Sequence, residues 1–186
     1  MTADEFAHRA DRKDYELLNG RLAPRTVSLR AAFVAGDVFV ALTESARPRG
    51  GWAFPAGLGY ACFPDRPDHV RRPSASLVRA GRLHDGPELR AEFAPVAPDL
   101  VVEVISPDDR AANVNQKTRE WLDAGVQLVW VIDPEARTVF AYHRDRPATA
   151  DIVREADTLT GGPVLPGFAL AAAELFRFPA AASSSP

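Results

Sequence analysis

The 186-residue sequence has one cysteine, two lysines and no long apolar run, and each shortage excludes something. With Cys62 alone, the chain cannot form an internal disulfide or a cysteine-rich zinc site, which fits a reducing compartment. No apolar stretch reaches the roughly 18 residues that a membrane span needs. The first 13 residues mix acids and bases and lack the apolar core of a signal peptide. We therefore expect a cytoplasmic protein that has no membrane partner.

The chain also has little net charge. The net charge of −3 gives no global basic field that would hold nucleic acid, so any such contact needs a local patch. Hydrophobic residues make up 46% and charged residues 25%, which excludes a disordered chain, a coiled coil and a collagen-like chain. We expect a single domain over residues 1–179 and a disordered, low-complexity tail over residues 180–186.

The pattern of apolar and turn-forming residues predicts a mixed α/β fold, with one sheet and helices against it. Asp108 or Asp109 is expected to cap the helix after the most apolar run, and Gly125 to end it. In the helix that Ser28 opens, Leu29, Phe33 and Val40 are expected to share one apolar face with Ala32. The predicted helices are Thr2 to about Lys13, Ser28–Glu44, Asp109 to about Ala124, and Leu170–Phe176. The predicted strands are a hairpin over Tyr15–Pro24, short strands over Trp52–Arg79 that include Ser74–Arg79, then Leu100–Ile105, Leu128–Ile132, Thr138–Tyr142 and an edge strand at Ile152–Arg154, with a loop over Gly81–Val96.

Glu103 is the one charged residue inside the most apolar run, Leu100–Ile105. Burying a carboxylate is costly unless it is paired or binds a metal, so Glu103 is either a structural partner of an arginine or a site residue. Asp99 lies four residues earlier and is expected on the same strand face. At about 3.3 Å per residue their Cα atoms are roughly 13 Å apart, which is too far for easy chelation of one ion. Asp99 is therefore equally well explained as a strand-entry residue.

Lys117 is one of two lysines beside 20 arginines and follows Glu103 in the next predicted helix. Its compact charge suits contact with a phosphate or an activated water, although a solvated surface lysine is an equal alternative. The arginines at 71, 72, 79, 82 and 90 form either a phosphate-binding patch or a solvated rim. The four histidines are scattered without zinc-ligand spacing, and there is no glycine-rich phosphate loop or nucleophile elbow.

Several motifs together resemble the putative restriction endonuclease (Uma-two) family of the PD-(D/E)xK nuclease superfamily. The strongest are Pro98–Pro107, Lys117, Ala124–Val126 and Trp130–Pro134; Tyr15–Gly20 and Leu165–Phe168 also match. The middle of the chain, residues 26–70, matches poorly. The resemblance implies a restriction-endonuclease-like mixed sheet and Mg²⁺- or Mn²⁺-dependent hydrolysis of phosphodiester bonds in DNA.

The same resemblance implies the roles of single residues. Glu103 would be the acid of the (D/E)xK motif and a metal ligand, Lys117 would supply the lysine from the following helix, and Glu16 would join the site from the N-terminal hairpin. The family reads Pro-Asp where this chain has Pro73-Ser74, so Ser74 stands at a metal-binding position. A hydroxyl is a poor replacement for a carboxylate on a hard divalent cation. Asp99 or Asp68 would then have to compensate.

Three functions remain open at this point. The first is a Mg²⁺-dependent DNA endonuclease with Glu103, Lys117, Glu16 and Asp99 in its site, weakened by Ser74. The second is a catalytically inactive relative that binds nucleic acid or a protein partner in the same cleft. The third is a small α/β accessory protein without a nucleic-acid role. A homodimer is compatible with all three.

Overall fold

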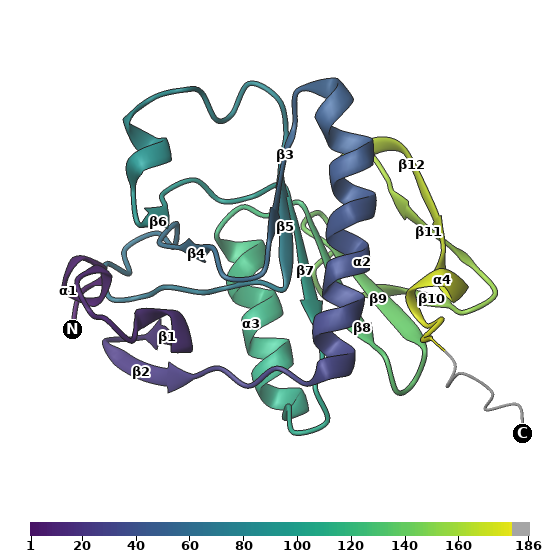
Figure 1. The fold of residues 1–186 in the computed structure, drawn as a ribbon, viewed down its shortest axis with the longest axis horizontal. Coiled ribbons are helices and arrows are strands. Elements are labelled where there is room, and N and C mark those ends of the chain that lie inside the picture. Colours follow the sequence, from purple (N-terminus) through teal and green to yellow (C-terminus); the bar gives the residue numbers. More distant parts are fainter. Residues whose placement is uncertain (180–186) are drawn as a thin grey trace, which may run out of the picture.

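The computed structural model describes residues 1–179, and its centre is a six-stranded mixed sheet with the order β10-β9-β8-β7-β5-β3 (Figure 1). Of its five neighbouring pairs, β7 and β8 are parallel and the other four are antiparallel. The strands are β3 (Trp52–Pro55), β5 (Ala75–Val78), β7 (Leu100–Val104), β8 (Leu128–Asp133), β9 (Thr138–His143) and β10 (Ala150–Arg154).

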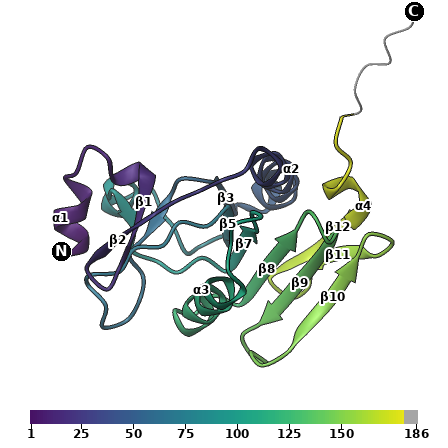
Figure 2. The same ribbon diagram turned by 90° about the horizontal axis from the view of Figure 1, so that it is seen from below.

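Two helices cover the opposite faces of this sheet, as Figure 2 shows. The helix α2 (Leu29–Ala46) packs on one face, and α3 (Ala111–Asp123), the crossover between β7 and β8, packs on the other. Side chains of β7 alternate between the two cores because successive residues point to opposite faces of a strand. Leu100, Val102 and Val104 lie in the core beneath α2, and Val101 lies in the core beneath α3.

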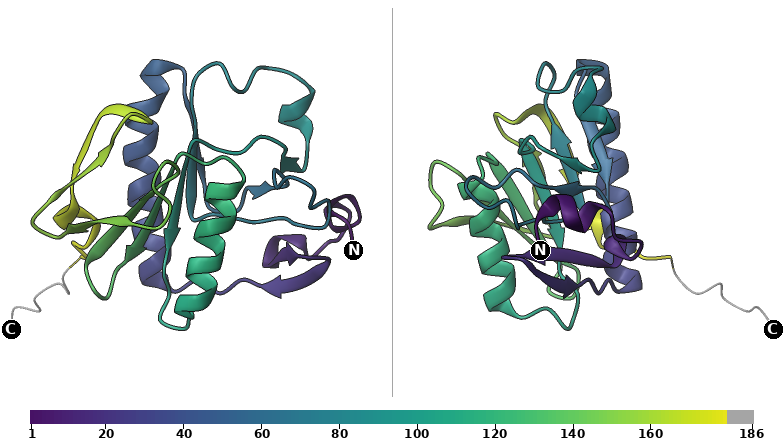
Figure 3. Two further views of the ribbon diagram at one scale, coloured as in Figure 1. Left: turned by 180° about the vertical axis from the view of Figure 1, so that it is seen from behind. Right: turned by 90° about the vertical axis from the view of Figure 1, so that its left-hand side faces the viewer.

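Three two-stranded sheets flank the centre. At the end of the molecule that holds the N-terminus is the hairpin of β1 (Tyr15–Leu18) and β2 (Arg21–Pro24). In the right-hand view of Figure 3 this hairpin lies between α2 and α3. Near it are α1 (Ala3–Ala7) and the parallel pair of β4 (Gly59–Tyr60) and β6 (Phe93–Ala94). At the other end, β11 (Thr158–Gly161), β12 (Leu165–Ala171) and α4 (Ala172–Leu175) extend the core beneath α2. None of the helices within residues 1–179 is long and apolar enough to span a membrane.

The predicted sheet elements are confirmed. Leu100–Val104 and Leu128–Asp133 are buried strands, as their β-branched, apolar composition indicates. Asn19 and Gly20 adopt positive φ angles of 50° and 76° in the hairpin turn, as the Asn-Gly pair predicts. Ala150–Arg154 forms an edge strand of the central sheet. The apolar side chains expected in the core from these two strands are all buried: Val101, Val102, Val104, Trp130 and Ile132.

The predicted apolar face of α2 is wrong. Leu29 is 92% exposed, and Phe33 and Val40 are also exposed. The buried face instead carries mostly small and β-branched residues: Ala31, Val34, Ala35, Val38, Leu42 and Ala46. Their small side chains let the helix pack closely on the β-branched surface of the sheet. Close packing therefore decides which face of α2 is buried, and the larger apolar side chains remain outside.

The predicted helices also differ from the observed ones at their ends, because some of their terminal residues form other hydrogen bonds. The Asp109 carboxylate accepts from the Ser106 backbone N–H at 2.8 Å and so closes the turn after β7; α3 begins later, with Arg110 at its N-cap. Residues 165–171 form a strand because they pair with Thr158–Gly161, a strand that the sequence reasoning missed, so the last helix shortens to α4. The first helix ends at Ala7, and a 3₁₀ turn over Arg12–Asp14 follows. The predicted loop over residues 81–96 holds a 3₁₀ turn, Pro87–Arg90, and β6. The expected disordered tail lies outside the described residues.

Candidate active site

A polar pocket of about 260 Å³ opens at the carboxyl end of β7, where the sheet, α3 and the N-terminal hairpin meet. Glu103 enters it from β7, Lys117 from α3, Glu16 from β1, and Ser74 from the start of β5. These four residues are far apart in the chain, and the fold brings all of them to one cavity. The expectation that Glu103 faces a polar pocket within reach of Lys117 is confirmed.

Glu103 is held by two donors inside the pocket. Its Oε2 lies 3.0 Å from the Lys117 Nζ, and its Oε1 accepts a 2.7 Å hydrogen bond from the Trp121 indole N–H. No arginine among the described residues pairs with it, so the alternative of a structural Glu–Arg pair is wrong. Burial raises the pKa of Glu103, and the charge of Glu16 raises it further, while Lys117 opposes both effects.

Lys117 lies between the two acids. Its Nζ is 3.0 Å from an oxygen of Glu16 and 3.0 Å from one of Glu103, and it donates to the Arg72 carbonyl at 3.0 Å. All three hydrogens of the ammonium therefore have a partner, and the side chain is only 19% exposed. Burial lowers the pKa of Lys117, but the two carboxylates outweigh it and the pKa is raised. The alternative of a solvated surface lysine is therefore wrong.

Glu16 is the more strongly held of the two acids. One oxygen accepts from the Arg72 backbone N–H at 2.7 Å and faces Lys117, and the other accepts from the Arg71 guanidinium at 2.8 Å. Burial raises the pKa of Glu16, but the charges of Lys117 and Arg71 together with these bonds lower it to about 2. Glu16 is therefore ionised under all ordinary conditions, and the pKa values of the two acids are pushed in opposite directions.

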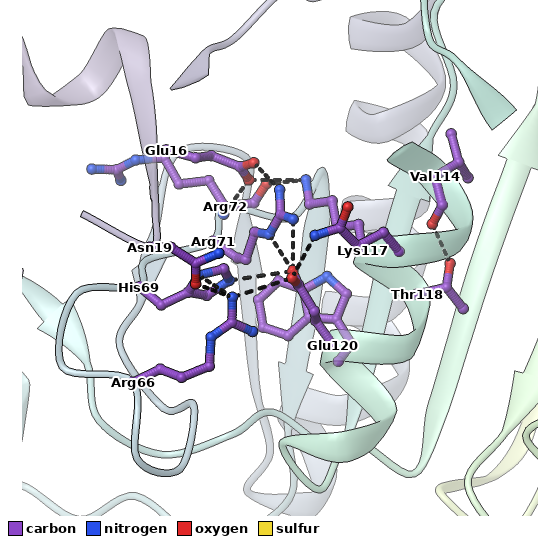
Figure 4. Close-up of polar contacts among 12 residues, drawn as sticks. Glu16, Asn19, Arg66, His69, Arg71, Arg72, Val114, Lys117, Thr118 and Glu120 are labelled. Atoms are coloured by element: carbon purple, nitrogen blue, oxygen red, sulfur yellow. Dashed lines mark hydrogen bonds and ion pairs between the residues drawn. The ribbon is translucent and has the colours of Figure 1, made fainter. Parts of the chain in front are cut away.

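Behind Glu16 lies a buried network that the sequence reasoning missed (Figure 4). Arg71 donates to both Glu16 and Glu120, and Glu120 also receives bonds from His69 and Arg66. Burial raises the pKa of Glu120, but His69 and Arg71 hold it well below its ordinary value. Arg71 is thus buried and ion-paired, and Arg72 is buried with its guanidinium donating to backbone carbonyls, so neither forms a solvated rim. A signal was present, since Glu120 follows Lys117 by three residues and so lies on the same face of α3.

Ser74 lies beside Glu103 but already has a structural bond. Its hydroxyl oxygen accepts from the Val104 backbone N–H at 3.0 Å, and its own N–H donates to the Val102 carbonyl at 2.9 Å. The hydroxyl therefore links the start of β5 to the end of β7. It contributes no charge to the pocket.

The structure does not bring Asp99 to this pocket. Asp99 lies at the opposite end of β7, is 1% exposed, and pairs with Arg79 and Arg82. Asp68 is not among the pocket residues either; it lies beside Gly20 of the hairpin turn. Neither acid is placed to compensate for Ser74.

Glu16 and Glu103 are the candidate ligands for a divalent cation in this pocket. Within residues 1–179 no group of three acidic, histidine or cysteine side chains is placed to hold a metal ion. Glu16 and Glu103 do converge on one point, which the Lys117 ammonium occupies. Mg²⁺ is commonly bound by one or two carboxylates, with substrate phosphates and water as the other ligands. Glu16 and Glu103 would therefore supply at most two of the ligands of Mg²⁺, and a phosphate group and water would have to supply the rest.

Comparisons with known proteins agree with the fold. A family model described as "Putative restriction endonuclease", Uma2, matches residues 3–173. A solved structure described as "a putative nuclease belonging to DUF820" from Anabaena variabilis ATCC 29413 is 22% identical and covers 95% of this chain and 97% of its own, with a TM-score of 0.75. No curated protein matches the chain. The solved structure supports the fold, a mixed sheet flanked by helices.

Proposed function

The chain belongs to the Uma2 family of putative restriction endonucleases, and from this premise we propose that it hydrolyses phosphodiester bonds of DNA slowly at the pocket around Glu103, in a Mg²⁺-dependent reaction. One observation carries the proposal: an acid from the central strand, an acid from the hairpin and a lysine from α3 meet at one point. A buried cluster of this kind, open to a pocket and with perturbed pKa values, is typical of a catalytic site.

Each residue has a proposed role. Glu103 and Glu16 would hold the divalent cation, which when bound supplies a Lewis acid that polarises the scissile phosphate. Lys117 would donate from Nζ to the phosphate or to the attacking water and so stabilise the developing negative charge. Arg71 is a positioning residue, because it fixes the Glu16 carboxylate and lowers its pKa, and Glu120 is another because it holds Arg71 in place. Arg25 also lines the pocket and would orient the DNA backbone.

Ser74 is the reason for expecting a slow reaction. A carboxylate at this position would add a full negative charge next to Glu103, and charge-assisted contacts of this kind are typically worth about 1.5–3 kcal/mol. Since every 1.4 kcal/mol is about a factor of ten in affinity, its absence is expected to weaken Mg²⁺ binding by about one to two orders of magnitude.

The test is Ser74→Asp, measured by calorimetric titration with Mn²⁺ and by cleavage of a supercoiled plasmid. We expect tighter Mn²⁺ binding and faster cleavage than in the natural protein. Adding Glu103→Ala to the same chain should abolish both gains, because both acids would share one ion. Thr158→Asp is the matched control, since it adds the same charge at an exposed site on β11.

One outcome would contradict the assignment of Ser74. If the natural protein cleaves at an ordinary nuclease rate and Ser74→Asp changes nothing, Glu103 and Glu16 hold the ion without need of a third acid, and Glu16→Gln should then abolish cleavage.

A second function, binding of DNA or a protein partner without cleavage, is favoured by a specific observation. Both carboxylates are already neutralised, Glu103 by Lys117 and Glu16 by Lys117 and Arg71, so the pocket is electrostatically satisfied without a metal ion. This function predicts DNA binding that survives EDTA, weakens with salt, and is unaffected by Glu103→Gln. Fluorescence anisotropy with a labelled duplex, measured beside plasmid cleavage, would distinguish it, because the metal-dependent function requires that cleavage is lost in EDTA and in Glu103→Gln, whereas this function predicts unchanged binding and no cleavage.

A further inference from the structure

A second cavity, of about 300 Å³, lies at the opposite end of the central sheet from the candidate active site. It is formed where α2 ends, β5 ends and β12 begins, near the upper end of α2 in Figure 1. Its floor is apolar and its rim carries three arginines: the floor residues are Ala46, Leu77, Val164 and Leu165, and the rim residues are Arg49, Arg79 and Arg82. Nothing in the proposed nuclease reaction uses this cavity.

Two of the three rim arginines bind one acid. Asp99 accepts from the Arg79 backbone N–H at 2.8 Å and from its Nε at 2.9 Å, and it lies 2.8 Å from the Arg82 Nη1. Among residues 1–179 no acid pairs with Arg49. The rim therefore carries a positive surplus, in a chain whose net charge is −3.

Asp99 also orients the two arginines that it binds. It is itself buried, whereas Arg79 and Arg82 remain 51% and 36% exposed, so their outer N–H groups stay available. No hydrogen bond within the described residues uses the Nη atoms of Arg79. Because these long side chains are already held in place, less conformational entropy is lost when a ligand binds. The guanidinium group is also the side chain best suited to bidentate recognition of carboxylate or phosphate.

From this arrangement we infer that the cavity binds a small amphipathic anion, with an apolar body on the floor and a carboxylate or phosphate monoester against the arginine rim. The size supports a small ligand, because a volume of about 300 Å³ is at the lower end of the range for ligand sites. The chemistry of the floor excludes an inorganic ion as the best occupant, since such an ion would leave the apolar surface uncovered.

The probes are octanoate, octyl phosphate, inorganic phosphate and octanol, each titrated by calorimetry into the full-length protein. We expect both amphipathic anions to bind and to compete, and we expect inorganic phosphate and octanol to bind at least about tenfold more weakly. Comparing octanoate with octyl phosphate identifies the preferred head group.

Variants test the location. Arg82→Gln and Arg49→Gln should each weaken binding by about tenfold, while Arg21→Gln, an exposed arginine on the hairpin, should leave it unchanged. Ala80→Trp should abolish binding, because Ala80 is exposed and lines the cavity, so a large side chain fills it without entering the core. Ala80→Ser is the matched control, and an unchanged melting temperature shows that each variant is folded.

Several results would overturn the inference. The first is that neither anion binds at millimolar concentration, and the second is that Ala80→Trp leaves binding intact. The third is that Arg21→Gln weakens binding as much as Arg82→Gln or Arg49→Gln does. A loss of duplex DNA affinity in Arg82→Gln as large as the loss for octyl phosphate would instead assign the rim to nucleic acid. Because the cavity is remote from Glu103, none of these results depends on whether the protein cleaves DNA.

Discussion

The two ends of β7 each hold a buried acid, and the two acids have opposite surroundings. At the carboxyl end, Glu103 shares one lysine with a second acid, Glu16. At the amino end, Asp99 has two arginines to itself. The first end therefore concentrates negative charge around a cation, and the second concentrates positive charge around an anion.

This difference shows that spacing along a strand does not define a joint site. Asp99 and Glu103 are four residues apart in the chain, yet Glu103 lines the candidate active site while Asp99 lies outside it and has different neighbours. Burial also differs for the partners: Lys117 is 19% exposed, whereas Arg79 and Arg82 keep much of their contact with water. Losing a partner should therefore cost more at the Glu103 end than at the Asp99 end.

The largest expected effect is that of Lys117→Met. Removing the ammonium leaves two buried carboxylates facing each other, and loss of one partner of a buried ion pair typically costs about 3–5 kcal/mol. Urea unfolding at neutral pH should show a loss of this size. Lys13→Met is the matched control, since Lys13 is the other lysine and is exposed. Equal stability of the two variants would contradict the proposed electrostatic role.

The next effect is that of Glu16→Gln, and it depends on pH. Folding lowers the pKa of Glu16 from an ordinary value of 4.5 to about 2, so its ionised form stabilises the folded state above pH 4.5 and that contribution is lost as the pH falls toward 2. A shift of this size corresponds to roughly 3 kcal/mol. Urea unfolding of both proteins from pH 7 to pH 3 should therefore show a difference that narrows below about pH 4.5. A difference that stays constant with pH would refute the assignment to ionisation.

Asp99→Asn should have a smaller effect. The side chain is buried, but the arginines that lose their charged partner can still be hydrated, so we expect a cost of about 1–3 kcal/mol. Urea unfolding at neutral pH should show a smaller loss of stability for Asp99→Asn than for Lys117→Met. If Asp99→Asn proves more costly, exposure of the partners is not what separates the two ends.

The smallest effect is expected for Arg82→Gln. A half-exposed arginine contributes little to stability, about 0.2–1 kcal/mol, although it lies on the rim of the second cavity. Thermal unfolding should leave Arg82→Gln within this range of the natural protein and of Arg21→Gln. A loss above about 2 kcal/mol would show that Arg82 is needed for folding, beyond the range of an exposed pair.

The strands, the hairpin and the order of elements could be predicted because their signals are local. Runs such as Leu128–Ile132 and the Asn19-Gly20 turn need no partner to be recognised. The buried face of α2 could not be predicted, because both faces carry apolar residues and the sheet selects the small ones. The strand β11 was missed for a similar reason, since Thr158–Gly161 becomes a strand through its pairing with β12.

The mixed sheet and the place of Glu103 in a buried central strand could be predicted from the sequence, which also singled out Lys117, because a lone charge in an apolar run and a rare lysine are visible without a fold. Which acid joins Glu103 follows from the tertiary structure. Glu16 and Arg71 are 55 residues apart in the chain, and their contact, like that of Lys117 with both acids, exists because the hairpin, β5 and α3 meet at the end of β7. Asp99 is close to Glu103 in sequence but lies away from the pocket, since a strand is extended and its two ends lie on opposite sides of the sheet.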